Sequence, residues 1–269
     1  MSSITNQNIA YKLACEKVAD AIDTSALKLS LMGDGAMTEY ADWLVWGHQE
    51  FEHLTDLPKL KGLKHIRNLD ISETQVSGLS ELSDLNSLKT LDLSECPVTE
   101  LSYLYTIKNL EELYISNCPF EDFSQLCFIK NLKKIDAYGT KIKNISGIST
   151  LTGLESLTIG ATCVSEITEI SQCKLLKELC ISNTRVSELE PLKYLYGLES
   201  ISIPNTKIQD FSTLSSLKHI KKLVIDENQF DPISKIKLLN DIKYIVKSKR
   251  GGAISSIDLH EIEAWLLNN

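Results

Sequence analysis

The chain has 269 residues, of which 43% are hydrophobic, and it carries a formal charge of −8 at pH 7. This size and composition allow a substantial core in one or two domains, so we expect a soluble, globular protein. The acidic balance argues against nucleic-acid binding, which needs a basic surface that follows the phosphates, and favours a protein partner with a basic surface.

Residues 1–56 predict an N-terminal cap. Residues 8–23 carry apolar side chains at helical spacing, and residues 26–31 alternate as a short strand. Residues 32–56 break this pattern and contain Trp43 and Trp46, so an alternative function is ligand or partner binding through this irregular insert, with the rest of the chain as its support. The side chains expected to face the core are Ile9, Leu13, Val18 and Ile22 in the helix, and Leu27, Leu29 and Leu31 in the strand.

The start of the chain also bears on location. It lacks a basic region followed by an apolar run, and no apolar run of about 18 residues occurs elsewhere, so we expect neither Sec-type export nor a membrane span. We therefore expect a cytoplasmic protein, or one delivered into a host cell without a Sec-type signal.

A period of 22 residues runs through residues 57–247 without an insertion, in units of the form LxxLxLxx(T/C/N)x(V/I/F)xx(L/F/I)xxLxxL. The alternating LxL predicts a short strand, and the LxxL spacing predicts a helical or 3₁₀ turn that returns the chain. One unit cannot form a core alone, but stacked units share one, with strands about 4.8 Å apart in a parallel sheet. The first apolar strand position is occupied by Leu69, Leu91, Leu113, Ile135, Leu157, Leu179, Ile201, Leu223 and Ile245.

The end of the chain predicts a second cap. Residues 247–256 predict a basic, glycine-containing turn. Asp258 and Glu261 form the pattern of a capping box ahead of apolar residues, which predicts a helix. We therefore divide the chain into an N-terminal cap (1–56), eight full repeat units (57–247) and a C-terminal capping helix (248–269).

The repeat unit resembles the leucine-rich repeat family, in particular the 22-residue class of bacterial internalin-like proteins. The resemblance is carried by phrases such as LDISETQVSGLSEL (69–82), LCISNTRVSELEPL (179–192) and ISIPNTKIQDFSTL (201–214). It implies an α/β repeat solenoid, shaped as an arc with a parallel concave sheet, 3₁₀ or helical turns on the convex side, and helical caps at both ends. It also implies a non-enzymatic scaffold that binds other proteins on the concave sheet, as a bacterial effector or an intracellular regulator.

Cys96 and Cys118, each followed by proline, occupy the same position in two successive units. In the family this position is an inward ladder of asparagines, and Thr or Cys can fill it in a reduced form. No histidine lies near either cysteine in the repeat register, so we expect no metal site and no cofactor. Neighbouring ladder positions are close enough for a disulfide, but seven cysteines without CxxC spacing favour reduced thiols, with Cys180 accessible.

The concave face carries the functional prediction. Its outward strand and turn positions hold nine acids and two bases over eight units, with no His or Arg, so an enzyme is not expected. Acids and tyrosines gather in the first four units and suit a basic partner, although acids on an open sheet also serve solubility alone. We expect a monomer. The predicted partner-binding residues are Asp70, Glu73, Asp92, Glu95, Glu112, Tyr114, Asn117, Asp136 and Tyr138.

Overall fold

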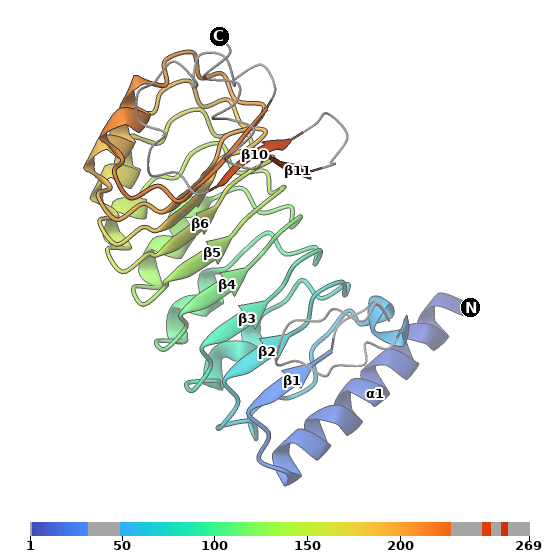
Figure 1. The fold of residues 1–269 in the computed structure, drawn as a ribbon. Helices are drawn as coiled ribbons and strands as arrows, with labels where there is room; N and C mark the ends of the chain where they lie inside the picture. Colours follow the sequence, from blue (N-terminus) through green and yellow to red (C-terminus); the bar gives the residue numbers. More distant parts are fainter. Residues whose placement is uncertain (1, 32–48, 227–243, 249–253, 258–269) are drawn as a thin grey trace. The chain divides into compact units, whose positions relative to one another are not determined.

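The computed structural model describes residues 2–31, 49–226, 244–248 and 254–257. The chain forms two compact units, Met1–Lys141 (unit 1) and Ile142–Asn269 (unit 2). Each unit is built around parallel strands joined by 3₁₀ turns (Figure 1). The predicted parallel sheet, the 3₁₀ return turns and the N-terminal helix are confirmed. The expected boundaries at residues 56 and 247 stay predictions.

The described residues of unit 1 form five parallel strands in chain order, with the helix α1 beside the first of them (Figure 1). The strands have three residues each, and each repeat returns through a 3₁₀ helix, labelled η. The elements are α1 (Ser2–Asp23), β1 (Lys28–Ser30), η1 (Gln49–His53), β2 (Asn68–Asp70), η2 (Ser80–Asp84), β3 (Thr90–Asp92), η3 (Ser102–Thr106), β4 (Glu112–Tyr114), η4 (Phe123–Phe128) and β5 (Lys134–Asp136).

The leucine spacing explains why the return segments are 3₁₀ rather than α-helical. A 3₁₀ helix has three residues per turn, so leucines three apart lie on one side of it. Leu82 N–H donates to the Leu79 carbonyl (3.1 Å), and Leu85 N–H donates to the Leu82 carbonyl (3.0 Å). All three leucines are buried. The same side chains that define the repeat in the sequence therefore form the core under the sheet.

The ladder position is buried from Thr74 to Thr184, and its polar groups are satisfied in two ways. Thr74 and Thr140 donate their hydroxyls to the carbonyl three residues earlier, at 2.9 and 2.8 Å. Cys96 Sγ reaches the Ile71 carbonyl of the preceding repeat (3.0 Å), and Cys118 Sγ reaches the carbonyl of Leu93 (3.1 Å). The two cysteines therefore take the place of ladder residues and tie one repeat to the one before it.

The buried side of α1 agrees with the prediction at Val18, whereas Leu13 is only half-buried and the other predicted residues are exposed. Ala10, Ala14, Val18 and Ala21 are buried, while Ile9 and Ile22 are exposed. The helix packs through its small side chains, which allow the backbone a close approach, whereas hydrophobicity alone favoured the larger residues. The buried residues are spaced four, four and three residues apart, so they follow the helical period as well as the predicted residues do.

The cap strand also departs from prediction at one residue. Leu29 and Leu31 are buried, but Leu27 is 50% exposed. The Leu27 carbonyl accepts hydrogen bonds from the N–H groups of Arg67 (2.8 Å) and Asn68 (3.1 Å), so its backbone joins the next repeat. Leu27 lies just before β1, and its side chain is at the surface.

Unit 2 repeats the same architecture with a different ending. The strands β6–β10 are parallel, and β11 pairs antiparallel with β10. The predicted turn at 247–256 is therefore partly strand, and the predicted helix at 258–269 lies outside the described residues. The elements are η5 (Ile148–Thr150), β6 (Ser156–Thr158), η6 (Thr168–Gln172), β7 (Glu178–Cys180), η7 (Glu190–Tyr194), β8 (Ser200–Ser202), η8 (Ser212–Ser216), β9 (Lys222–Asp226), β10 (Tyr244–Ser248) and β11 (Ile254–Ile257).

Candidate functional site

The candidate site is the outward surface of the unit 1 sheet. We call it the acidic face: the outward side chains of β2–β5 and of the turns after them, within residues 68–139. Strand register brings the predicted residues together in two rows, because in-register residues of parallel strands are adjacent. One row is Asp70, Asp92, Tyr114 and Asp136, and the other is Asn68, Thr90, Glu112 and Lys134.

Asp70 and Asp92 are neighbouring carboxylates at the start of the first row. Asp70 accepts hydrogen bonds from the backbone N–H and hydroxyl of Ser72 (2.9 and 2.7 Å), and Asp92 accepts one from the N–H of Ser94 (2.9 Å). Burial, together with the adjacent Asp70 charge, raises the pKa of Asp92 to about 6. The charge of this part of the face therefore changes in the weakly acidic range.

Tyr114 is held between two charged side chains of the second row. Its hydroxyl donates to Glu112 Oε2 at 3.0 Å, and Lys134 Nζ lies 5.0 Å from the centre of its ring. Burial raises the pKa of Tyr114, so the phenol stays protonated at neutral pH. The half-buried ring is thus fixed in orientation before any partner arrives.

Asp136 and Tyr138 form the far end of the acidic face. Asp136 Oδ1 accepts from the Ser116 hydroxyl (2.7 Å) and from the Tyr138 N–H (3.1 Å). The Tyr138 side chain is 37% exposed. Of the two tyrosines predicted to contact a partner, Tyr138 is therefore the one that offers its ring to solvent, and Tyr114 is the one that is locked in place.

The remaining predicted residues lie in left-handed turns. Glu73, Glu95 and Asn117 have φ values of 57°, 62° and 59°, and Gly139 at the same repeat position has 69°. Asn117 Nδ2 donates to Glu95 Oε1 at 3.3 Å. A Cβ on Gly139 would lie 2.2 Å from Asn117 Oδ1, so the glycine makes room for that side chain. These side chains project beside the two rows rather than within them.

The outward surface of unit 2 is lined mainly by small and hydroxyl side chains. The Ser156 hydroxyl donates to Glu178 Oε2 (3.1 Å), and the Cys180 thiol lies 3.2 Å from the Ser182 hydroxyl. Of the nine residues predicted to bind a partner, none is in this unit.

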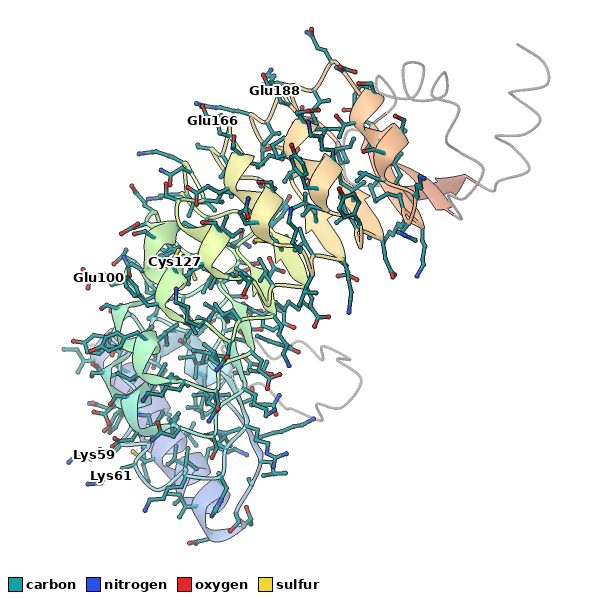
Figure 2. All side chains as sticks on the ribbon, turned by 90° about the vertical axis from the view of Figure 1, so that its left-hand side faces the viewer. Lys59, Lys61, Glu100, Cys127, Glu166 and Glu188 are labelled. Carbon is teal, nitrogen blue, oxygen red and sulfur yellow. The ribbon has the colours of Figure 1, made fainter. Side chains whose placement is uncertain are left out.

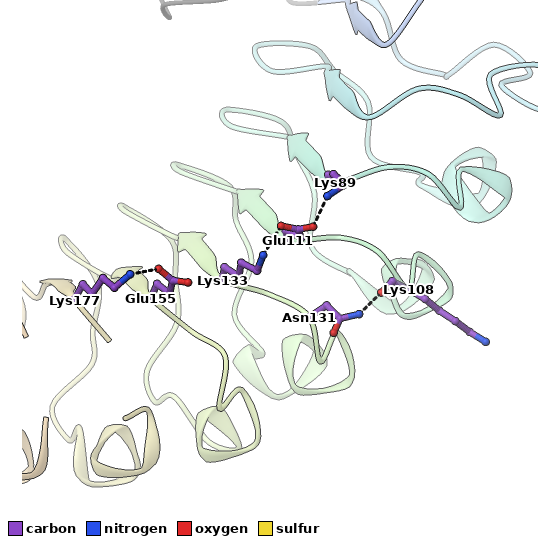
Figure 3. Close-up of polar contacts among 7 residues, drawn as sticks. All are labelled: Lys89, Lys108, Glu111, Asn131, Lys133, Glu155 and Lys177. Carbon is purple, nitrogen blue, oxygen red and sulfur yellow. Dashed lines mark hydrogen bonds and ion pairs between the residues drawn. The ribbon is translucent and has the colours of Figure 1, made fainter. Parts of the chain in front are cut away.

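The structure adds a column of ion pairs that the sequence interpretation missed. Glu111 accepts from Lys89 and from Lys133, one repeat away on either side, at 2.7 Å each (Figure 3). In unit 2, Glu155 pairs with Lys177 at 2.6 Å (Figure 3). The signal was present, because the position two residues before the first apolar strand residue alternates between basic and acidic residues from Lys89 to Lys221.

The buried thiols Cys96, Cys118 and Cys173 are structural rather than reactive. All seven cysteines are free. Burial raises the pKa of Cys118 to about 12 and that of Cys173 to about 11, so neither is a thiolate at neutral pH. Cys180 is half-buried and Cys163 is exposed, so the prediction named the less accessible of these two. Cys163 follows the ladder position, where the chain has already turned outward.

Other predicted sites fall partly outside the described residues. Trp43 and Trp46 of the irregular insert lie in the undescribed range 32–48. Within the described ranges, no three His, Cys, Asp or Glu side chains gather closely enough to hold a metal ion. Among the helices that the structure describes, none combines the length and the hydrophobicity needed to cross a membrane.

Comparison with known proteins agrees with this architecture. The family model for leucine-rich repeats (2 copies) matches residues 86–127. Internalin C2 of Listeria monocytogenes is similar in structure, with a TM-score of 0.65 and 20% identity over 78% of this chain and 92% of its own. The internalin inlF of Listeria monocytogenes is also similar, with a TM-score of 0.60 and 18% identity over 89% of this chain and 90% of its own.

A leucine-rich repeat protein of Leptospira interrogans is also similar, with a TM-score of 0.65 and 23% identity over 74% of this chain and 57% of its own. No curated protein matches the chain. At these identities the likeness to solved structures establishes the fold. The unbroken 22-residue period, the parallel strands with 3₁₀ returns and the family model matched over residues 86–127 together show that the chain has a leucine-rich repeat fold like that of the internalins.

Proposed function

We propose that the chain is a non-enzymatic scaffold that binds a basic protein partner on the acidic face of unit 1. Leucine-rich repeat folds present extended surfaces that act as protein-interaction scaffolds. The observation that carries the proposal is the row Asp70, Asp92, Tyr114 and Asp136, in which three carboxylates lie in register around a fixed aromatic ring.

The charge state of the row supports a basic partner. Within the part of the chain that the structure describes, Asp70, Asp92 and Asp136 form no ion pair, and they accept hydrogen bonds from the uncharged donors of Ser30, Ser72, Ser94, Ser116 and Tyr138. An arginine or lysine of a partner would therefore meet uncompensated charge. Such complementarity speeds association and selects the partner more than it adds affinity.

The aromatic residues supply the contact area. Tyr114 is already ordered by Glu112 and Lys134, so a partner that covers it does not have to immobilise it. Tyr138 is more exposed and would gain the larger burial. Tyrosine is enriched among the residues that dominate binding energy at protein interfaces. We expect Glu73, Glu95 and Asn117 to contribute at the rim.

Catalysis is not part of the proposal, because the outward positions of the acidic face hold no histidine, arginine or cysteine, and their acids are carboxylates. The proposal extends to a monomeric bacterial protein that acts as an effector or an intracellular regulator, cytoplasmic or delivered into a host cell. Its support is the bacterial origin of the similar internalins.

A photo-crosslinking amino acid in place of Tyr138 would identify the partner in cells that contain it. Binding of the isolated partner is then measured by titration against the native chain and against the double variant Tyr114→Ala/Tyr138→Ala. We expect the double variant to bind at least about tenfold more weakly, as for two central aromatic residues.

The matched control is Tyr103→Ala/Tyr105→Ala, which removes two exposed tyrosines of η3 from the return side of the same unit. It should bind the partner as the native chain does. The proposal is wrong if the Tyr114/Tyr138 variant folds and keeps its full affinity, or if both double variants lose affinity equally.

A further inference from the structure

A second charged surface lies in unit 1, in the segment that leads into β2. Residues 57–69 contain Lys59, Lys61, Lys64 and Arg67 and no acid, in a chain whose net charge is −8. All four side chains are exposed. Figure 2 shows Lys59 and Lys61 close together and pointing away from the ribbon. Residues 59–67 thus form a basic segment in a chain that is acidic overall.

These bases differ from Lys89, Lys133, Lys177 and Lys221, which pair with acids of a neighbouring repeat. Lys89 and Lys133 are both bonded to Glu111. Arg67 occupies the same repeat position, but its neighbour one repeat on is Lys89 rather than an acid. In the ranges that the structure describes, Lys59, Lys61, Lys64 and Arg67 take part in no ion pair. Among the described residues, no acid compensates their charge.

Two exposed apolar side chains lie beside these bases. Ile22, at the end of α1, is 40% exposed and contacts the same segment, since a Cβ on Gly62 would lie 2.4 Å from Ile22 Cδ1. Leu27 is 50% exposed, and its carbonyl accepts from the N–H of Arg67 at 2.8 Å. Apolar side chains beside a group of bases can form the centre of an interface that has charged residues at its rim.

We propose that this surface binds an acidic segment of a partner protein, whose carboxylates meet the bases and whose apolar side chains cover Ile22 and Leu27. We call this surface the basic corner, consisting of Ile22, Leu27, Lys59, Lys61, Lys64 and Arg67. It lies outside the acidic face and is independent of the function proposed for that face. The chain would then hold two partners of opposite charge on one unit.

The surroundings favour a peptide segment over a larger polyanion. Three exposed acids flank the basic corner: Asp23 at the end of α1, Asp56 before Lys59 and Asp84 in η2. A membrane surface or a nucleic-acid duplex would have to approach these acids as well as the bases, at an unfavourable electrostatic cost. A single acidic segment can follow the bases alone, because they lie within one repeat.

The test uses the full chain and a fluorescein-labelled peptide of glutamates with a leucine at every fourth position, measured by fluorescence anisotropy. Two control peptides separate the contributions: one replaces the glutamates with glutamine and the other replaces the leucines with serine. We expect the Glu/Leu peptide to bind most tightly and its binding to weaken as salt is added, since exposed charges are screened.

The decisive variant is Lys59→Glu/Lys61→Glu/Lys64→Glu. Each exposed ion pair contributes roughly two- to threefold in affinity, so the triple variant should weaken binding on the order of tenfold. The matched control, Arg185→Glu/Lys207→Glu/Lys218→Glu, makes the same change of net charge on exposed residues of unit 2 and should leave binding within about twofold. Leu27→Ser tests the apolar contribution without altering the core and should also weaken binding.

Three results would overturn the proposal. The first is no binding of the Glu/Leu peptide to the native chain. The second is an equal loss of affinity in the two triple variants, which would mean that only net charge matters. The third is tighter binding to phosphatidylserine vesicles or to duplex DNA than to the peptide, which would assign the basic corner to a different class of partner.

Discussion

Replacing Asp92 by asparagine should stabilise the protein at neutral pH. The Asp92 carboxyl is packed into the sheet surface beside Asp70, and burial and that neighbouring charge raise its pKa to about 6 from an ordinary 3.8. The charged form is therefore disfavoured in the folded state. An asparagine has nearly the same shape, and its carbonyl oxygen can still accept the Ser94 N–H hydrogen bond that Asp92 accepts at 2.9 Å.

The magnitude and its pH range follow from the two pKa values. A tenfold change in the proton-binding constant corresponds to about 1.36 kcal/mol of folding free energy, so the difference between a pKa of 3.8 and one of about 6 corresponds to about 3 kcal/mol. Residual solvent exposure of the carboxyl lowers the expected stabilisation to about 1–3 kcal/mol. Because the folded pKa is the higher one, the folded protein binds the proton more tightly than the unfolded chain does. The contribution of Asp92 to stability is therefore largest below about pH 4 and is lost as the pH rises through about 6.

The assay is urea unfolding of native and Asp92→Asn protein, followed by circular dichroism at several pH values. The variant should be more stable by about 1–3 kcal/mol at about pH 7.5, and the difference should vanish near pH 4. Asp136→Asn is the control, because Asp136 accepts two hydrogen bonds on the same face and its replacement should not stabilise. A stability difference that is constant with pH, or an Asp92→Asn protein less stable at neutral pH, would refute the reasoning.

Three further predictions concern the stability of the repeats, each measured by the same unfolding assay. Leu113→Ala empties a fully buried core position and should cost about 3 kcal/mol, whereas Leu175→Ala, at an exposed position, should cost less than about 0.5 kcal/mol. Glu111→Gln removes two ion pairs but should cost less than about 1 kcal/mol and lose its effect in high salt, because the pairs are exposed. Ala161→Gly should stabilise unit 2 by up to about 1 kcal/mol, since residue 161 has φ of +53°, and a loss of stability would show that the turn holds alanine without strain.

Much of the fold could be predicted because the determining side chains recur at a fixed spacing. Leu69 and its counterparts define the strands, and leucines three apart define the 3₁₀ returns. The errors arose at the ends, where no repeat constrains the interpretation. In α1 the buried side is set by alanines such as Ala14, and Leu27 is exposed because no further repeat covers it.

The candidate site could be predicted only in part. Alternation along the strands was enough to place Asp92 and Tyr114 on the same outward surface. The contact of Tyr114 with Glu112 and Lys134 depends on side-chain conformations that a pattern does not contain. The basic corner depends on which bases lack an acidic neighbour, and this requires knowing which residues meet across repeats.

The left-handed turn after each strand has a consequence for how this surface can diversify. Glu73, Glu95 and Asn117 adopt the conformation while their N–H groups donate to the carbonyls of Ser94, Ser116 and Tyr138 in the next repeat, at 2.7–2.8 Å. The stacking of repeats thus fixes the backbone, and Glu, Asn, Gly and Ala all occur at this position in the chain. Mutation can therefore change the side chain there with a limited loss of stability, which gives natural selection a position beside the acidic face at which specificity can evolve while the fold is preserved.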